Sequence, residues 1–474
     1  MRIPHIINLN TLAEFQPSPD ALDLIGENER GLVAENFEWN KDHCPTLADC
    51  CVQTISKHFD KYQILDELPC MDRDHLLEIL SHDLPLEVAV PVLNDEYYWQ
   101  QRYKAKFGLI LRRKPANWTW KNLYMERHVQ EIIEYAQPQY NDEETLGDIL
   151  DLCAPYVERL IITQLQSWKP PLTMEKEDIP ETFQTDHVNF IYILRKLPLI
   201  TELDIVYGVN SVGEGFSWNM FQMSVLDCQR LGKAILDLTN LEILRIHRSR
   251  LEYKHCQALI QNLIKNNTIV ELDLSHCDIG DQGALCVAKF IQKCITLKIL
   301  NLSNNLIRNT GAEGIGYIMT RPKRANLEVL NLRLNPLGTD GVMNILRALV
   351  RCDIPKELSL SGCQFKEDTI PKVALMLKMN ESLKKLDISN NWIGKDGGEL
   401  LIEGLEENNT LEWLDIRDTD ITPQQMVKIE GILSRNRDLE EYQRLLEEKG
   451  LEMEVNVTYF SKETDHKEYI EKLV

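Results

Sequence analysis

Residues 297–316, with the sequence LKILNLSNNLIRNTGAEGIG, give the clearest indication of how this chain folds. It begins with the pattern LxxLxLxxN, in which apolar residues at fixed spacing line one side of a short strand and a polar residue then turns the chain. The residues that follow fit an amphipathic helix that returns to the next strand. One such unit buries very little apolar surface, so the pattern predicts a stack of repeats.

The pattern recurs through the second half of the chain. Seven copies begin at positions separated by 28, 28, 30, 28, 28 and 28 residues. They are Leu241/Leu244/Ile246, Ile269/Leu272/Leu274, Leu297/Leu300/Leu302, Leu327/Leu330/Leu332, Pro355/Leu358/Leu360, Leu383/Leu386/Ile388 and Leu411/Leu414/Ile416. A degenerate copy, Ile200/Leu203/Ile205, lies 41 residues before the first of these. We therefore expect about eight repeats in an α/β leucine-rich-repeat solenoid, a horseshoe with strands inside and helices outside.

A small residue that can hydrogen-bond to the backbone fills the turn after each strand, which predicts a structural role for it. These turn residues are Ser249, Cys277, Asn305, Asn335, Cys363, Asn391 and Thr419. The signature resembles the ribonuclease-inhibitor subclass of leucine-rich repeats. That resemblance covers roughly half of the chain.

The side chains between the core leucines should point into the concave face, where a partner protein would bind. One row reads Asp204, Arg245, Asp273, Asn301, Asn331, Ser359, Asp387, Asp415, and its neighbour reads Glu202, Ile243, Glu271, Ile299, Val329, Glu357, Lys385, Trp413. From these rows we take Trp413 as the best anchor for a partner, with Arg245, Asp273, Asn301, Asn331, Lys385, Asp387 and Asp415 as further contacts. The alternative is that Asp and Asn in the first row serve only hydrogen bonds at the strand ends.

Three parts of the chain are expected: a mainly helical domain at 1–185, the solenoid at 186–438, and a carboxy-terminal cap and tail at 439–474. In the first part, helical spacing of apolar residues predicts helices at 46–58, 73–80, 123–136 and 145–166. A solenoid needs a polar cap over its last repeat, and the segment after Thr422 has helical spacing with charge outside. Within the tail, 453–459 alternates like a strand.

A basic, aromatic island stands out between Trp99 and Gln130. The cations that we take as candidate contacts are Arg102, Lys104, Lys106, Arg112, Arg113, Lys114 and Lys121. One interpretation is a contact for an acidic polymer such as a microtubule surface. The other is that the aromatic side chains form a core while the cations pair with acidic runs elsewhere.

Composition excludes several classes of function. A net charge of −22 argues against binding nucleic acid or an anionic membrane, and we expect neither as a partner. No apolar run could span a membrane and no signal peptide is recognisable, so we expect a cytosolic protein. The 12 cysteines lack metal-ligand spacing and are interpreted as core residues. We expect no cofactor, metal or small-molecule substrate, and no catalytic residue, since His247 and His276 have no positioned nucleophile.

Two amino-terminal stretches, PTLADCCVQTISKHFDKYQILDELP (45–69) and DLPLEVAVPVLNDEYYW (83–99), ahead of such a solenoid resemble the T-complex-associated testis-expressed family, subunit five of the nexin-dynein regulatory complex. The resemblance is expected to span most of the chain. It implies a structural, non-enzymatic subunit in the axoneme of cilia and flagella. That subunit would link doublet microtubules and regulate dynein-driven bending. It also implies other subunits of that complex as partners, with tubulin or dynein as further ones.

Rival classes fit less well. A nucleotide-driven receptor needs GxxxxGK[ST], and neither Gly232-Lys233 nor Gly394-Lys395 has that context. A Ran-type GTPase activator would begin its repeats near the amino terminus. The stronger rival is a substrate adaptor of a ubiquitin ligase, because Leu65–Leu84 resembles the start of an F-box ahead of leucine-rich repeats.

Overall fold

The computed structural model describes residues 46–108, 118–136, 143–165, 186–209, 218–321 and 326–448. The chain divides into two compact units, Met1–His128 and Val129–Val474, and each is described by itself. The division between the two units falls within α7 (Trp120–Tyr135). The sequence predicts a domain edge at residue 185 instead, and that residue lies outside the described ranges. The predicted strand at 453–459 also lies outside them. Among the described residues, none of the helices combines the length and apolar character needed to cross a membrane.

The first unit is helical, as its apolar spacing predicts. It contains α3 (Leu47–Lys57), α4 (Cys70–Ile79), α5 (Leu86–Val92), α6 (Glu96–Phe107) and the first part of α7. Thr46 starts α3 with a capping box, in which its side chain accepts from the Asp49 N–H and the Asp49 side chain accepts from the Thr46 N–H. Three of the four expected helices, at 46–58, 73–80 and 123–136, are confirmed within a few residues at their ends.

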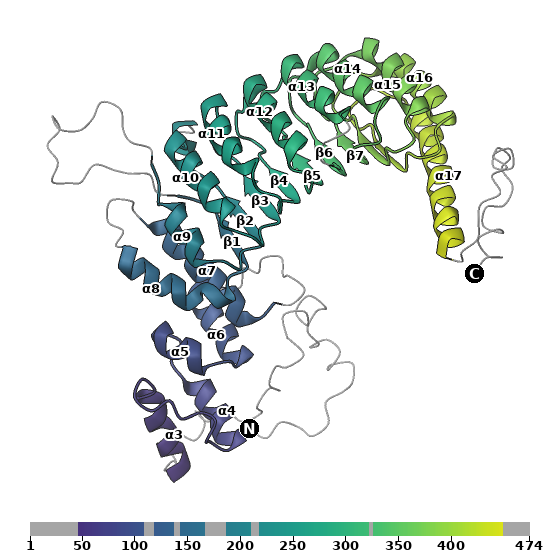
Figure 1. Ribbon diagram of the computed structural model, residues 1–474. Coiled ribbons are helices and arrows are strands. Elements are labelled where there is room, and N and C mark those ends of the chain that lie inside the picture. The colour runs from purple at the N-terminus through teal and green to yellow at the C-terminus, as the bar shows by residue number, and fades with distance from the viewer. Residues whose placement is uncertain are drawn as a thin grey trace, which may run out of the picture. The chain divides into compact units, whose positions relative to one another are not determined.

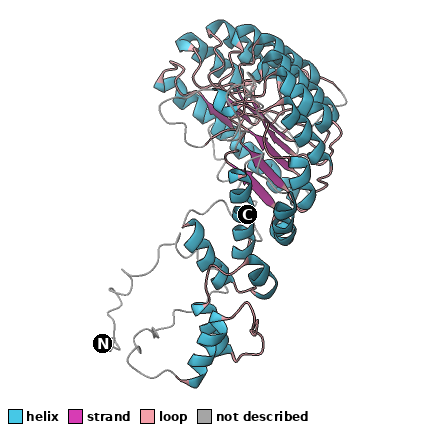
Figure 2. Ribbon diagram, turned by 90° about the vertical axis from the view of Figure 1, so that its left-hand side faces the viewer, coloured by secondary structure: helices cyan, strands magenta, loops and turns pink. Residues whose placement is uncertain are grey.

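The second unit is built on one parallel sheet whose strands follow each other in chain order (Figure 1). The strands are β1 (Arg159–Ile162), β2 (Glu202–Ile205), β3 (Ile243–Ile246), β4 (Glu271–Asp273), β5 (Ile299–Asn301), β6 (Val329–Asn331), β7 (Glu357–Ser359), β8 (Lys385–Asp387) and β9 (Trp413–Asp415). The helices are α8 (Glu143–Cys153), α9 (Phe190–Lys196), α10 (Val225–Leu236), α11 (Tyr253–Leu263), α12 (Gly280–Lys293), α13 (Asn309–Met319), α14 (Gly338–Leu349), α15 (Ile370–Met379), α16 (Gly394–Glu406) and α17 (Pro423–Glu448). From α10 to α16 the helices line the outer side of the sheet, and the strands form its inner side (Figures 1 and 2). The expected leucine-rich-repeat solenoid is therefore confirmed.

The first strand corrects two expectations. Residues 145–166 are not one helix, because α8 ends at Cys153 and β1 pairs with β2 in parallel, Leu160 opposite Leu203. Within the described ranges the solenoid therefore has nine strands, against the expectation of about eight repeats. Pro155 disfavours a continuous helix, and the β-branched run that follows favours a strand. Val157, Leu160 and Ile162 keep the spacing of the later copies and are buried.

The core forms where each strand faces its helix. The middle leucine of each copy is buried, completely so at Leu244, Leu300 and Leu386, and the residues on either side of these three are less buried. This alternation follows from the pleat of a strand, which sends successive side chains to opposite faces. The repeat pattern thus fixes the register of the whole sheet, as the pairing of Leu300 with Leu330 shows.

The turn residues form a ladder of hydrogen bonds inside the solenoid. Asn335 is fully buried. Its Nδ2 donates to the carbonyls of Leu302 and Leu332, both at 2.8 Å. Its Oδ1 accepts from the N–H groups of Asn305 (2.9 Å) and Ile307 (3.0 Å). The predicted structural role of these residues is confirmed, because they satisfy backbone groups that no strand partner reaches.

The same turns force left-handed backbone at recurring positions. His276, Asn304 and Asn390 have φ between 53° and 57°. Leucine occupies such a conformation at Leu306 (φ 56°) and Leu334 (φ 58°). A side chain with a Cβ costs roughly 1–2 kcal/mol there, and Asn, Asp and Gly tolerate the conformation best.

A long helix closes the last repeat, as expected for the segment after Thr422. It is α17, which runs through the expected edge at 438 without a break. Its Asn436 donates to the carbonyl of Leu411 at 2.9 Å. Asn408 and Asn380 precede Asn436 at 28-residue steps, and they donate to the carbonyls of Leu377 and Leu349 at 2.7 Å, in the helix of the preceding repeat. Asn436 therefore keeps the spacing of these asparagines but bonds to a different point of the preceding repeat.

The cysteines fall into two groups, contrary to the expectation that all are core residues. Cys50, Cys51 and Cys70 are exposed. Those of the solenoid are mostly buried, and burial raises the pKa of Cys363 to about 12.

Because the thiolate is the reactive form, we expect the three exposed cysteines to react with a thiol reagent at pH 8 within minutes, and Cys363 only after unfolding. Peptide mapping by mass spectrometry measures this, and rapid labelling of Cys363 in the folded chain would contradict it.

Candidate partner-binding surface

The strand register assembles both rows that the sequence predicts on the concave face. The members of the row that begins with Glu202 and ends with Trp413 lie opposite one another on neighbouring strands from β2 to β9. The same holds for the row that begins with Asp204 and ends with Asp415. The rows are therefore continuous surfaces. Their side chains differ in what they contact.

The first row is occupied mainly by hydrogen bonds within the chain. The Oδ1 atoms of five of its members accept from the N–H two residues further on, at 2.8–3.1 Å. These members are Asp273, Asn301, Asn331, Asp387 and Asp415. Such bonds turn the chain at the strand ends. These bonds give the five residues the structural role that the alternative interpretation expects of them.

Asp415 shows this internal role most strongly. Its carboxylate is almost completely buried and accepts from Arg417 Nε at 2.9 Å and 3.0 Å. Hydrogen bonding from Arg417 holds the pKa of Asp415 below its usual value. The carboxylate is therefore charged and already paired.

Ion pairs also occupy the amino-terminal part of the concave face. Arg245 donates to Glu271 at 2.7 Å and also pairs with Glu202. Burial alone would lower the pKa of Arg245, but the bonds to these two carboxylates raise it overall. His247 lies 2.8 Å from Asp204. Arg245 is therefore engaged within the chain, and its single positive charge is shared by two carboxylates.

The carboxy-terminal part of the concave face is hollowed and partly apolar. A groove of about 680 Å³ lies over β6 to β9, with Val329, Lys385 and Trp413 in its lining. Trp413 is 45% exposed, whereas the other apolar members of its row, Ile243, Ile299 and Val329, are half-buried. Lys385 Nζ lies 2.7 Å from Glu357, on the same wall. An aromatic side chain in a groove with charged neighbours is the usual arrangement of an energetic anchor for a protein partner.

Arg437 is a groove residue that the repeat pattern did not predict. It comes from α17, and its Nη1 donates to the carbonyl of Glu412 at 2.8 Å. Neighbouring Lys384 pairs with Glu440 of α17 and with Glu412. The cap helix therefore forms one wall of the groove. A period in the sequence cannot show where the helix after the last repeat returns to the strands.

The basic island is corrected in part. Arg102 and Lys121 are buried, and Arg102 Nη2 donates to the Leu84 carbonyl at 2.6 Å while Lys121 Nζ donates to the Val90 carbonyl at 2.7 Å. Both cations also lie over the ring of Trp99. Both cations stabilise an aromatic core and are not available to a partner. An aromatic core is what the second interpretation of the island expects.

Other members of the island have different positions. Lys104 is half-buried, and Lys106 is exposed, with its Nζ 2.9 Å from His128 Nδ1. Arg112, Arg113 and Lys114 lie outside the described residues. A contact between the island and a partner would therefore have to use the cations that follow Tyr103, other than the buried Lys121.

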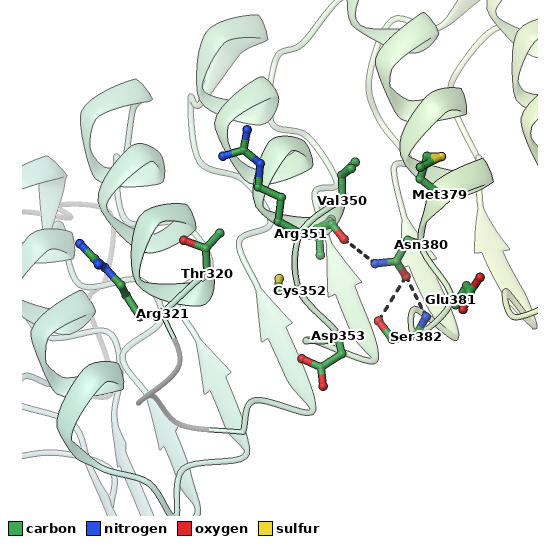
Figure 3. Close-up of a pocket in the computed structure, with 11 residues that line it drawn as sticks. Thr320, Arg321, Val350, Arg351, Cys352, Asp353, Met379, Asn380, Glu381 and Ser382 are labelled. Atoms are coloured by element: carbon green, nitrogen blue, oxygen red, sulfur yellow. Dashed lines mark hydrogen bonds between the residues drawn. The ribbon is translucent and has the colours of Figure 1, made fainter.

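A second hollow lies on the edge of the solenoid where α13 to α15 end (Figure 3). Its central polar group, Asn380, donates to the Leu349 carbonyl at 2.7 Å and accepts from the N–H groups of Ser382 and Leu383. These bonds satisfy loop backbone and do not prepare a reacting group. Among the described residues, no cluster of three or more His, Cys, Asp or Glu side chains could hold a metal ion.

Comparisons with known proteins agree with this architecture. A family model described as Leucine Rich repeat matches residues 265–288, 293–316, 325–346 and 380–401. Dynein regulatory complex subunit 5 of Mus musculus is 32% identical over 269 residues, which cover 55% of this chain and 54% of that protein. The Homo sapiens protein of the same name is 30% identical, with the same coverage of each chain.

A ribonuclease inhibitor from Sus scrofa is 30% identical over 43% of this chain and 45% of that protein. The chain spans about half the length of the curated relatives it matches, and the similarity covers 55% of the chain. The chain is a leucine-rich-repeat protein similar to ribonuclease inhibitor, and it has curated homologues named dynein regulatory complex subunit 5.

Proposed function

We propose that this chain is a non-catalytic scaffold subunit of the dynein regulatory complex in the axoneme of cilia or flagella. In this role it links doublet microtubules and regulates dynein-driven motility through contacts between proteins. The similarity to curated proteins of that name, over 55% of the chain, supports the proposal. Its partners are then other subunits of the complex, with tubulin or dynein as further contacts.

The groove around Trp413 is the observation that carries the binding part of this proposal. Elsewhere on the concave surface, Arg245 and Asp415 are already paired within the chain. In the groove, a half-exposed indole lies beside Val329 and the charged walls supplied by Lys385 and Arg437. A partner that covers this indole gains apolar burial and pairs its own charges at the rim.

We expect Trp413→Ala to weaken binding of the partner about 10- to 30-fold, because truncating a central aromatic anchor costs roughly 2 kcal/mol. The free energy of unfolding should change by less than about 1 kcal/mol, since the side chain lies on the surface. The tagged full-length chain would be purified from ciliated cells, its co-purifying proteins identified, and the affinity of a captured partner measured against both forms.

The matched control is Tyr253→Ala, which removes a similarly exposed aromatic side chain, 43% exposed, from α11 on the outer side. Co-purification of dynein regulatory subunits supports the proposal. Recovery of the small adaptor of a ubiquitin ligase in their place would overturn it in favour of the F-box alternative. If the partner bound the wild-type chain and the Trp413 variant with equal affinity, its binding site would lie outside the groove.

A further inference from the structure

Four successive turns form a continuous ridge at the end of the strands. They follow β5 to β8 and comprise residues 303–308, 333–338, 361–366 and 389–394, which we name the turn ridge. Backbone hydrogen bonds join neighbouring turns: Asn304 N–H donates to Arg333 O (2.8 Å), Leu334 N–H to Ser361 O (2.8 Å), and Gly362 N–H to Ser389 O (3.0 Å). The side chains of the ridge therefore share one surface.

Two leucines on the ridge are placed unfavourably in two respects. Leu306 and Leu334 have left-handed backbone, and they are 53% and 43% exposed. At the position of Leu334, other turns of this chain carry residues that suit the conformation, such as Asn304, Gly362 and Asn390. Neither burial nor backbone preference explains leucine at these places, and strained residues of this kind concentrate at functional sites.

The two leucines belong to a longer apolar strip. A Cβ added to Gly362 would come within 2.8 Å of Leu334 Cδ2, so the glycine leaves room for Leu334 to lie across the next turn. Trp392, one turn further, is 63% exposed. Leu306 and Trp392 are separated by three strand spacings, roughly 15 Å.

The charge of the ridge differs from that of the chain. Its four turns contain Arg308, Arg333 and Lys366 but no Asp or Glu, in a chain whose net charge is −22. All three cations are exposed, and among the described residues no carboxylate lies within ion-pair distance of them. The turns on either side of the ridge carry Asp278 and Asp418. The apolar strip and the acid-free stretch coincide.

Acidic residues do follow the ridge, at the start of the next helices. Asp340 lies in the first turn of α14 and Asp396 in the first turn of α16. Carboxylates at these positions stabilise a helix through its dipole. They form a separate, negative border beyond the ridge. Carboxylates also lie near two of the ridge cations: Asp281 accepts from the Arg308 N–H at 2.8 Å, and the charge of Arg333 adds to the hydrogen bonding from Arg417 that lowers the pKa of Asp415.

We propose that the turn ridge is a second docking surface, separate from the concave groove, for an amphipathic helix of another protein whose apolar stripe is flanked by acidic residues. The apolar stripe covers Leu306, Leu334 and Trp392, and the acidic residues pair with Arg308 and Arg333. A strip of roughly 15 Å matches about ten helical residues, or three turns. Charge complementarity favours this partner over a basic one.

The test measures binding of a fluorescein-labelled helical peptide of about 18 residues, with leucines at helical spacing between glutamates, to the purified full-length chain. The variant combines Leu306→Asn and Leu334→Asn, residues that suit left-handed backbone. We expect binding to weaken at least about tenfold while the midpoint of thermal unfolding stays the same or rises. The control Leu375→Asn removes a leucine that is 48% exposed on α15 and should leave binding unchanged.

Other results would overturn the proposal. A midpoint lowered by several degrees in the double variant would show that the leucines serve folding. Unchanged binding by the double variant would show that the peptide binds elsewhere. Equal or tighter binding of a lysine version of the peptide, or of a short RNA, would exclude the acidic partner. Self-association that disappears in the double variant, measured by sedimentation, would identify a second copy as the occupant.

Discussion

Replacing Asn335 with alanine is expected to lower the free energy of unfolding by about 3–5 kcal/mol, one of the two largest effects that we predict for a single substitution. The side chain makes four hydrogen bonds to buried backbone groups at 2.8–3.0 Å. Each buried group left without a partner costs roughly 1–3 kcal/mol, and neighbouring carbonyls recover part of that loss. Urea unfolding followed by circular dichroism would measure the change.

The chain itself provides a graded comparison. Cys363 occupies the equivalent turn and donates to the Leu332 carbonyl at 3.3 Å. Asn335→Cys should therefore keep part of the hydrogen bonding to carbonyl groups and lose the hydrogen bonds that Oδ1 accepts. Its free energy of unfolding should lie between those of the alanine variant and the wild type. Asn409→Ala, at an exposed position, should change the free energy of unfolding by less than about 0.5 kcal/mol. If Asn335→Ala were as mild as Asn409→Ala, the ladder would not hold the turns together.

Replacing Gly404 with alanine is expected to destabilise the solenoid by about 3 kcal/mol. A Cβ at this position would lie 2.7 Å from the Ala374 carbonyl oxygen and 2.8 Å from the Ala374 Cα. Both are backbone atoms, so no side chain can rotate away. The helices α15 and α16 would have to separate, which opens the core on their inner side.

Gly431→Ala is the matched control, because that glycine also lies in a helix and its Cβ would meet nothing within 4 Å. Alanine is the better helix former, so this change should stabilise the chain by up to about 1 kcal/mol. The midpoint of thermal unfolding should therefore fall in the Gly404 variant and rise in the Gly431 variant, relative to the wild type. Two shifts of the same sign would contradict the close approach of α15 and α16.

The parts of the fold that depend on a regular period could be predicted from the sequence. The spacing of Leu300 and Leu330 fixed both the register and the order of the concave rows, because a parallel sheet with identical connections leaves no other choice. The first strand escaped prediction. Its Leu160 lies 43 residues before Leu203, so β1 is outside the 28-residue period and is recognisable only by its local triplet.

The candidate site could be predicted only in outline. Trp413 is recognisable because an indole between core leucines has to face the concave side. The pairing of Asp415 with Arg417 depends on a turn geometry that composition does not reveal. Burial of Arg102 could not be predicted either, since basic and aromatic residues alternate in the same way on a surface and around a core.

The 28-residue step that continues into α17 has a consequence for how the length of such a chain can change. Asn380, Asn408 and Asn436 keep this step from the ordinary repeats into the closing helix. An insertion or deletion of one whole repeat would therefore keep the spacing between the last repeat and the closing helix. The span of the arc would then change in discrete steps of one repeat.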